Sequence, residues 1–283
     1  MSRRLVLLLA IVPTALGILS ISASGASAEP KPTSITIGAK DFSFDAPPSI
    51  PGGSVKVTLD NTGAETHQID FVELDDGQTV ESVLAAAAAT GLQSTRKIAD
   101  YRSGANSARP GGSTSSIQTL TPGNYAIACL LPGPDGIPHV AKGMIQPITV
   151  EQPGKTANQK PPKATKIVLE DYQFDVPESF KGTGTIDITN KGDELHELVV
   201  GKLQDGKTIQ DVVTWGSQPA FQPWTIPQPF DDIGGITAMS PGNKSRIKLS
   251  NLEPGEYAFF CFVPNEDDVS HVAEGMVYPF TVK

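Results

Sequence analysis

The chain is short of positive charge: 22 Lys and Arg stand against 31 Asp and Glu, which gives a formal net charge of −9. Nucleic-acid binding needs a basic face, so this class of function is excluded. A basic partner protein could dock, although most acidic surfaces are simply solvated. Aromatic residues are also few at 6%, whereas the 27 Gly and 24 Pro favour an all-β fold with many turns over a helical one.

Long apolar runs are absent apart from one at the start, Leu5 to Ile21. It follows Arg3 and Arg4 and precedes Ala26-Ser27-Ala28, a small-residue cleavage site. This order is typical of a secretory signal peptide, so residues 1–28 are expected to be removed and the mature protein to be secreted or periplasmic, in the cell envelope. An uncleaved anchor is the alternative, which a run of about 17 residues barely permits. We expect no stable membrane insertion after cleavage.

Cysteine and histidine are also scarce, with two Cys and four His among 283 residues. At most one disulfide can form. Cys129 and Cys261 occupy equivalent positions in two apolar strand patterns, so a bridge would require two buried strands to face one another. We therefore expect both thiols to be unpaired. In an exported protein, metal ligation is the leading reason to retain such a thiol, because thiolate is a strong soft ligand.

One stretch of the sequence occurs twice. Residues 125–150 read YAIACLLPGPDGIPHVAKGMIQPITV, and residues 257–282 read YAFFCFVPNEDDVSHVAEGMVYPFTV. In both, nine residues separate Cys from His and four separate His from Met, and a further His lies upstream in a matching context. Every Cys and His therefore belongs to one of two sets: His67, Cys129, His139 and Met144; and His196, Cys261, His271 and Met276.

The duplication predicts a tandem repeat of two domains, residues 29–150 and 165–283, joined by a Pro/Lys-rich linker over residues 151–164. Alternating polar and apolar residues predict strands, as do the segments that flank the Cys, His and Met residues. These strands cover residues 34–37, 54–59, 67–71, 144–150, 165–169, 185–189, 196–200 and 276–282, with one more ending at each Cys. Thr79 to Thr90 and Thr208 to Trp215 predict one short helix per repeat, each with Thr as a possible N-cap. The variable segments 91–107 and 217–234 are expected to be surface loops.

Both repeats resemble the cupredoxins, the blue or type 1 copper domains. The similarity rests on the Asn-x-Gly stretches before His67 and His196 and on the two Tyr-x-x-x-Cys…His…Gly-Met segments. It implies two Greek-key β-sandwiches, each with a short helical insertion, and one type 1 copper ion per domain. The two sets of four residues would be the ligands: two His and the Cys in a plane and Met as the weak axial ligand. The resemblance also implies that the second His of each set lies near the surface and passes the electron out.

The nine residues between Cys and His depart from small cupredoxins, which usually have two to four. Copper nitrite reductases have a longer loop that CLLPGPDGIPHVAKGM resembles more closely. Their chemistry needs a second copper bound by additional His, and here all four His are already used, so we expect the chain not to be an enzyme. The same count argues against a multicopper oxidase, and a binuclear copper site would need two Cys in one loop.

The expected function is one-electron transfer between extracytoplasmic redox partners, with an unidentified redox protein as partner. Two alternatives remain open at this point. The first is copper storage or delivery, in which the metal is held but not cycled. The second is a metal-free cupredoxin-like scaffold that binds a partner through its long loops.

Overall fold

The computed structural model describes residues 32–154, 163–219 and 222–283. In its first half, up to residue 154, the strands are β1 (Thr33–Lys40), β2 (Ser43–Asp45), β3 (Ser49–Pro51), β4 (Gly53–Asn61), β5 (Asp70–Leu74), β6 (Ala99–Tyr101), β7 (Ser113–Leu120), β8 (Gly123–Ala128) and β9 (Ile145–Glu151). The helical segments of this half are α1 (Val80–Thr90) and the 3₁₀ turns η1 (Gln93–Lys97) and η2 (His139–Lys142). The signal peptide predicted over residues 1–28 and most of the predicted linker lie outside the described residues.

The second half, from residue 163, has the strands β10 (Thr165–Glu170), β11 (Gln173–Asp175), β12 (Gly184–Asn190), β13 (His196–Leu203), β14 (Phe230–Met239), β15 (Lys244–Leu249), β16 (Gly255–Phe260) and β17 (Val277–Val282). Its helix is α2 (Ile209–Gly216). The predicted strands are confirmed, although the one expected at 67–71 begins only at Asp70. In β4 and β12 the alternation of the sequence becomes an alternation of buried and more exposed side chains, because successive residues point to opposite faces.

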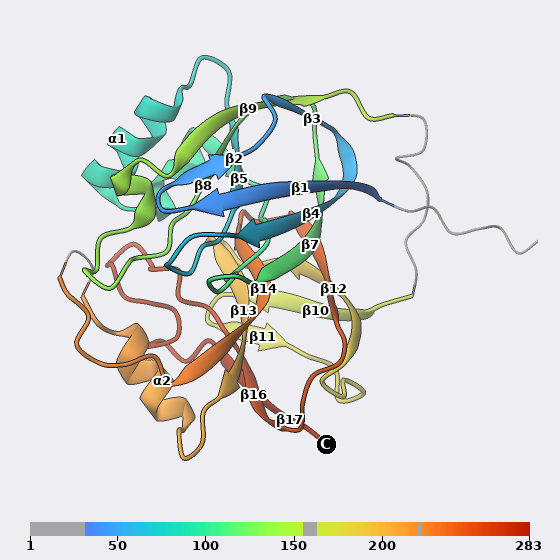
Figure 1. Cartoon of the computed structure of the whole chain (residues 1–283), viewed down its shortest axis with the longest axis vertical. Coiled ribbons are helices and arrows are strands. Elements are labelled where there is room, and N and C mark those ends of the chain that lie inside the picture. Colours follow the sequence, from blue (N-terminus) through green and yellow to red (C-terminus); the bar gives the residue numbers. More distant parts are fainter. Residues whose placement is uncertain (1–31, 155–162, 220–221) are drawn as a thin grey trace, which may run out of the picture.

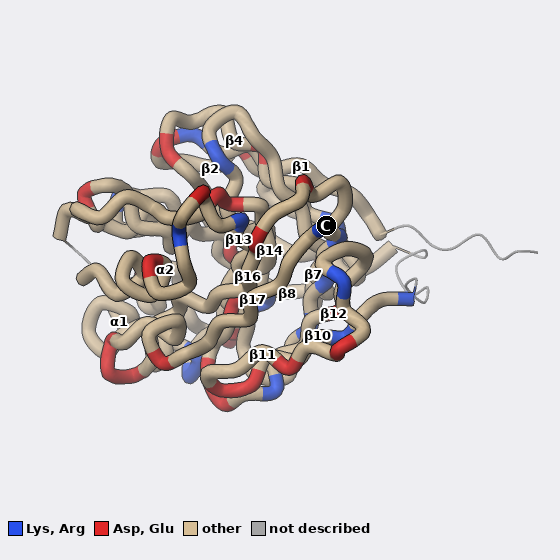
Figure 2. The backbone as a smooth tube through the Cα atoms, turned by 90° about the horizontal axis from the view of Figure 1, so that it is seen from below, with Lys and Arg blue, Asp and Glu red and all other residues tan. Residues whose placement is uncertain are grey.

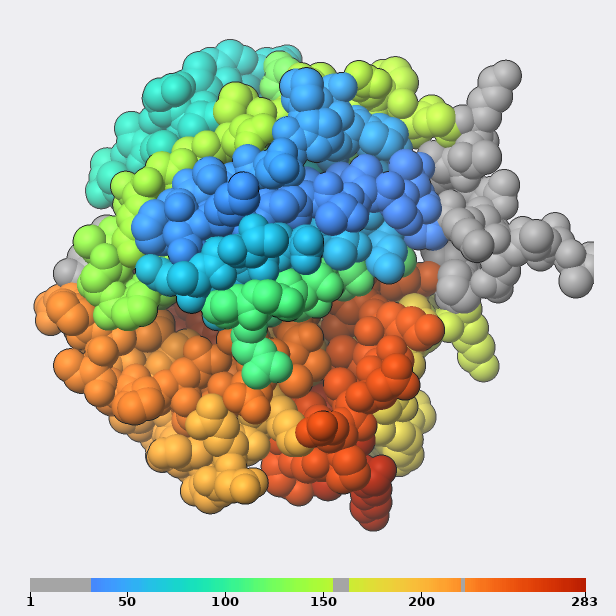
Figure 3. Space-filling view, viewed as in Figure 1, coloured from blue at the N-terminus to red at the C-terminus, as the bar shows by residue number. Residues whose placement is uncertain are grey.

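The molecule has two β layers, and one of them runs unbroken through both halves (Figure 1). That layer is an eight-stranded sheet in the order β11-β10-β12-β15-β7-β4-β1-β2, in which β15 joins β7 across the halves. The other layer consists of a four-stranded sheet, β14-β13-β16-β17, and a five-stranded sheet, β3-β9-β8-β5-β6. Isolated bridges from Arg102 to Met239 and from Ala105 to Ile236 connect these two sheets. The halves therefore share backbone pairing in both layers, and they lie directly against each other in the space-filling view (Figure 3).

Apolar side chains from the two layers meet in the interior. In the first half, Val57 and Leu59 of β4 pack in one cluster with Phe71 of β5 and Ile127 of β8. A larger cluster in the second half joins Ile188 of β12 to Leu198 and Phe259, and it also includes Tyr101 of the first half. Burial of this apolar surface is the main stabilising contribution to such sandwiches. Asp and Glu residues occur in the loops near α1 and β11, among other places (Figure 2).

Both predicted helices are confirmed, and each begins after the expected Thr. The Thr79 side chain accepts a hydrogen bond from the Ser82 amide, and the Ser82 side chain accepts one from the Thr79 amide. Thr208 and Asp211 form the same reciprocal cap in α2. These capping boxes satisfy amide groups that would otherwise have no partner in the first turn. Both helices lie on the same side of the molecule (Figure 1).

The expectation that segments 91–107 and 217–234 are surface loops is wrong for much of their length. Residues 103–108 are buried and run along β14, where Thr237 N–H donates to Gly104 O at 3.3 Å. Residues 230–234 belong to β14 itself. The physical reason is that the two halves pair through their backbones. Each half contributes one of these segments to that pairing, and the pairing buries it. No helix in the described part of the chain is long and apolar enough to cross a membrane.

Candidate metal centre

Each half gathers one Cys and two His into a buried cluster. His67, Cys129 and His139 form the first, and the second consists of His196, Cys261 and His271. Within each cluster the potential ligand atoms all lie within 4.8 Å of one another. All six residues are almost completely buried. The structure thus brings together three members of each predicted set.

In the first half the three residues come from separate segments. His67 lies between β4 and β5, where its N–H donates to Ala108 O at 3.1 Å. Cys129 directly follows β8, and His139 begins η2. Met144 joins them through the backbone, because its N–H donates to His139 O at 3.0 Å and its carbonyl accepts from Cys129 N–H at 3.1 Å. Met144 is buried in the same cluster as Cys129.

The nine residues between Cys and His fold into a small hairpin. In the first half Pro132 pairs with Pro138, and Gly133 N–H donates to Ile137 O at 3.0 Å. At its base, His139 N–H donates to Leu131 O at 2.9 Å, which returns His139 to Cys129. In the second half the counterpart of this base bond joins His271 N–H to Val263 O at 3.0 Å. The extra residues therefore pair with one another, and the base of this hairpin returns the second His to the Cys.

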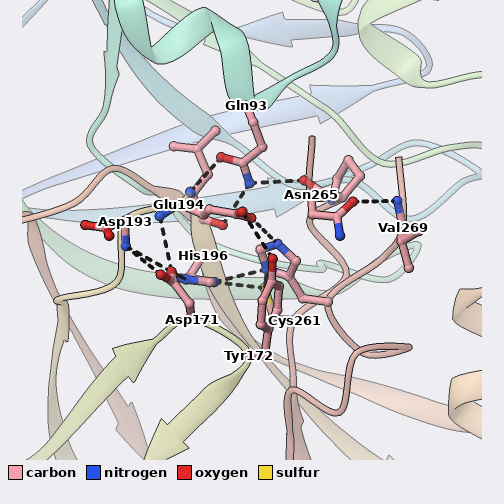
Figure 4. A network of polar contacts seen from close by, with 12 residues as sticks. Gln93, Asp171, Tyr172, Asp193, Glu194, His196, Cys261, Asn265 and Val269 are labelled. Atoms are coloured by element: carbon pink, nitrogen blue, oxygen red, sulfur yellow. Dashed lines mark hydrogen bonds and ion pairs between the residues drawn. The ribbon is translucent and has the colours of Figure 1, made fainter. Parts of the chain in front are cut away.

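The donor atoms converge in both clusters. In the first, the Nδ1 atoms of His67 and His139 are 3.1 Å apart, and Cys129 Sγ lies 3.5 Å from His139 Nδ1. In the second, the two Nδ1 atoms are 3.0 Å apart, and Cys261 Sγ lies 3.4 Å from that of His271 (Figure 4). Such separations suit a common metal ion about 2.0–2.3 Å from each donor, the usual range of metal–nitrogen and metal–sulfur bonds.

The amide group after the first His holds each sulfur in place. Gln68 N–H donates to Cys129 Sγ at 3.4 Å, and Glu197 N–H donates to Cys261 Sγ at the same distance. A hydrogen bond to a ligand sulfur stabilises its negative charge and tunes the potential of the bound metal.

A carboxylate lies against the outer nitrogen of every one of these His residues. The Nε2 atom of His67 is 2.6 Å from Asp41 Oδ1, and that of His139 is 3.0 Å from Glu65 Oε2. The equivalent pairs of the second half, His196 with Asp171 and His271 with Glu194, are both 2.9 Å apart (Figure 4). Because a carboxylate accepts, these pairs place the proton on Nε2 and leave Nδ1 free to bind a metal.

These four carboxylates were missed in the sequence. Asp41 and Asp171 occupy matching positions in KDFSFD and EDYQFD, and Glu65 and Glu194 each stand two residues before the first His. The signal that could have found them was an acidic residue present in both copies. Asp41 also accepts from the amides of Ala64 and Glu65, so it fixes the turn before His67 as well as the imidazole.

Burial disfavours the charged form of both thiols and of His271 in the metal-free protein. It raises the pKa of the Cys129 thiol to about 12 and that of the Cys261 thiol well above its ordinary value. Burial and the neighbouring His196 lower the pKa of His271 to about 4, although Glu194 opposes the shift. Metal binding must therefore release the thiol proton, which makes affinity depend on pH.

The donor set fits copper, with one ion in each half. Two imidazole nitrogens and a thiolate in a buried trigonal arrangement, with a thioether nearby, are the ligands of blue-copper sites. When bound, copper supplies a centre that accepts and returns one electron. The structure places Met144 and Met276 next to the clusters through their backbones, and their roles as axial ligands stay a prediction.

The imidazole expected to pass the electron out is shielded from solvent in both halves. The second His of each set does not lie at the surface: the side chain of His139 is 1% exposed and that of His271 is 0% exposed. A carboxylate lies against the outer nitrogen of each ring, and an aromatic side chain, Phe42 or Tyr172, packs against each imidazole. Sequence position alone could not show this, because Glu65 and Glu194 reach these rings only in the folded chain.

No family model and no curated protein matches the chain. Among solved structures, auracyanin from Roseiflexus castenholzii is similar at 26% identity, over 42% of this chain and 97% of that one, with a TM-score of 0.30. A copper-containing nitrite reductase from Thermus scotoductus is similar at 15% identity, over 89% of this chain and 62% of that one, with a TM-score of 0.27. A multicopper oxidase matches at 18% identity over 88% of both chains, with a TM-score of 0.25. The two β layers and the paired Cys-His clusters of the chain itself are those of a cupredoxin-like fold in two units.

The expectation that the chain is not an enzyme is contradicted by these comparisons, since nitrite reductases and a multicopper oxidase are among the similar structures. The exclusion rested on counting His residues that could hold further copper ions. A fold of this kind carries both electron carriers and enzymes, so neither the fold nor that count separates the two classes.

Proposed function

We propose that the chain is an exported copper protein that transfers single electrons between redox partners outside the cytoplasm. In this proposal two tandem domains, residues 29–150 and 165–283, each hold one type 1 copper ion. The ligands are His67, Cys129, His139 and Met144 in the first domain and His196, Cys261, His271 and Met276 in the second.

The observation that carries the proposal is the convergence of donor atoms within a fixed surrounding. In both halves the imidazoles are held from behind by carboxylates, and the sulfur is held by a backbone amide. A site whose ligands are already in place changes little between oxidation states, and this favours rapid electron transfer over slow uptake and release of metal.

In each half an aromatic ring packs against the second His and could carry the electron from the buried site to the surface. The Phe42 ring lies 4.8 Å from that of His139, and the Tyr172 ring lies 5.2 Å from that of His271. Phe42 and Tyr172 occupy matching positions and are partly exposed, whereas the two His are not. We place the exit for electrons at these rings, where a partner protein would dock.

The test is copper titration of the mature chain, residues 29–283, with visible absorption and metal analysis. The expected result is two copper ions per chain and an intense thiolate-to-copper band that disappears on reduction. A Cys129→Ala/Cys261→Ala double variant serves as the control and should lack the band. Copper bound without the band would point to storage or delivery, and a chain that binds no copper would overturn the proposal.

A further inference from the structure

A glutamine of the first half contacts the ligand segments of the second. Gln93 belongs to η1 and is 2% exposed. Its Oε1 accepts from Leu195 N–H at 2.8 Å, and its Nε2 donates to Leu195 O at 3.3 Å and to Pro264 O at 3.0 Å. Figure 4 shows this amide above the second cluster. All three bonds cross from one half to the other.

The two partners of Gln93 flank the metal cluster on different segments. Leu195 directly precedes His196 and is fully buried. Pro264 lies in the hairpin between Cys261 and His271, where its bridge to Ser270 closes the hairpin base. The Gln93 side chain therefore fixes the distance between two segments: the backbone just before His196 and the hairpin that ends at His271.

Gln93 is itself held firmly. Arg96 donates from Nε to Gln93 O at 3.0 Å and from Nη1 to Asp193 O. Thr95 shares a hydrogen bond of 2.8 Å with the buried hydroxyl of Tyr101. A side chain with few remaining degrees of freedom loses little entropy when it makes its contacts, so it can hold a precise geometry.

Each half contacts the hairpin between Cys and His of the other half. In the second half the segment after α2 reaches the hairpin of the first site, where Trp224 N–H donates to Pro134 O at 3.1 Å. That bond joins two backbone groups and holds only the hairpin. The Gln93 amide differs because it joins the hairpin to the segment of the first ligand His.

We propose that Gln93 is a positioning residue for the copper site of the second half, so that the properties of this site depend on the docking of the first half. The proposal rests on copper binding as proposed above. Loss of the Gln93 bonds would leave the buried amide and carbonyl of Leu195 without these partners and would let the ligand segments move apart. Groups that hydrogen-bond a metal ligand directly typically contribute a factor of 10–100 to metal affinity, and Gln93 holds the residue next to such a ligand, so we expect an effect at the lower end of this range.

The test uses Gln93→Met, which has a similar length and makes none of the three bonds. It is made in a Cys129→Ala chain, where only the second site is complete, and in a Cys261→Ala chain, where only the first is. The Cu(II) dissociation constant of the second site should rise about tenfold, with a shift of its reduction potential and thiolate-to-copper band. The first site should stay unchanged. Gln93→Glu retains the acceptor for Leu195 N–H and should give an intermediate effect.

Hydrogen exchange in the metal-free chain provides a readout that does not depend on copper. In Gln93→Met the Leu195 amide should exchange about tenfold faster, as expected for one lost hydrogen bond. The His67 amide, which is bonded to Ala108 O, should be unaffected. Unchanged exchange at Leu195 would overturn the proposal, and so would faster exchange with an unaltered second copper site. If the parent chain binds no copper, the proposed function fails, and exchange at Leu195 alone decides whether Gln93 holds this segment.

Discussion

The Nε2 atom of His139 lies 3.0 Å from Glu65 Oε2, in a ring that is 1% exposed. As a copper ligand, this imidazole would have a carboxylate behind it instead of water. The carboxylate makes the imidazole more basic and so favours Cu(II) over Cu(I). The same relation recurs between His271 and Glu194 at 2.9 Å. Both sites are therefore expected to have lower reduction potentials than the same ligands would have without these carboxylates.

Replacing these acids tests that effect. Glu65→Gln and Glu194→Gln retain the shape but remove the charge, so each should weaken Cu(II) binding at its own site about tenfold and raise that site's reduction potential. Copper titration and redox titration measure the two effects. The control is Glu178→Gln, an exposed carboxyl whose side chain should leave both sites unchanged. Equal potentials in the variants and the parent would contradict this prediction.

The aromatic exits can be tested without a known partner. Phe42→Leu and Tyr172→Leu remove the rings that lie against His139 and His271. Electron self-exchange between oxidised and reduced copies, followed by magnetic-resonance line broadening, should slow while the potentials remain close to those of the parent. Unchanged self-exchange in the double variant would mean that electrons leave elsewhere.

The free thiols should resist modification in the metal-free fold. Both Cys are unpaired, and burial raises the pKa of Cys129 to about 12. Thiolate is the reactive form, so at pH 8 the native thiol should react on the order of 10³-fold more slowly than an exposed one. Titration with a coloured thiol reagent before and after unfolding measures this. Two thiols per chain should appear on unfolding, and a titre of zero would reveal a disulfide.

Asp70 makes the stability of the metal-free protein depend on pH. Burial raises the pKa of this carboxyl from 3.8 to about 7, although a hydrogen bond from Gln68 opposes the shift. The folded state therefore binds the proton more tightly than the unfolded state does. The contribution of Asp70 to the free energy of unfolding is complete below pH 4 and is lost as the pH rises to about 7. This loss is on the order of 4 kcal/mol.

Asp70→Asn should remove this dependence, because the amide stays neutral and can still accept from Gln68. Thermal unfolding between pH 5 and pH 8 measures the change. Part of the pH dependence of the parent's unfolding temperature should persist in the variant, since burial also raises the pKa of Glu197 to about 7. A slope identical to that of the parent would show that Asp70 is ionised in the fold throughout this range.

Gly104 is expected to be essential for docking of the two halves. A Cβ atom at this position would overlap the carbonyl of Ile69, and it would lie 3.3 Å from Thr237 Oγ1 of the other half. Gly104→Ala should therefore destabilise the chain by about 3 kcal/mol, the upper range for overpacking. Chemical unfolding measures this. Gly154→Ala, where a Cβ meets nothing within 4 Å, is the matched control.

Local structure and the metal chemistry were readable from the sequence. Alternation predicted β4 and β12, and Thr79 and Thr208 predicted the starts of both helices, because these features depend on neighbouring residues. Two Cys and four His in a chain of 283 residues left few possible ligand sets. Three members of each set do converge, which is the part of the site that a duplicated spacing could indicate.

Only the tertiary structure showed how the two halves pack together and which residues surround the metal clusters. Segment 91–107 reads as a loop because it lacks periodicity, yet residues 103–108 are buried against β14 through backbone bonds that any side chain permits. Likewise, no local pattern links Gln93 to Leu195, 102 residues away, or Glu65 to His139. The residues of each copy determined which atoms could bind a metal, whereas tertiary packing, within each half and between the halves, determined what surrounds them, because those contacts join positions far apart in the chain.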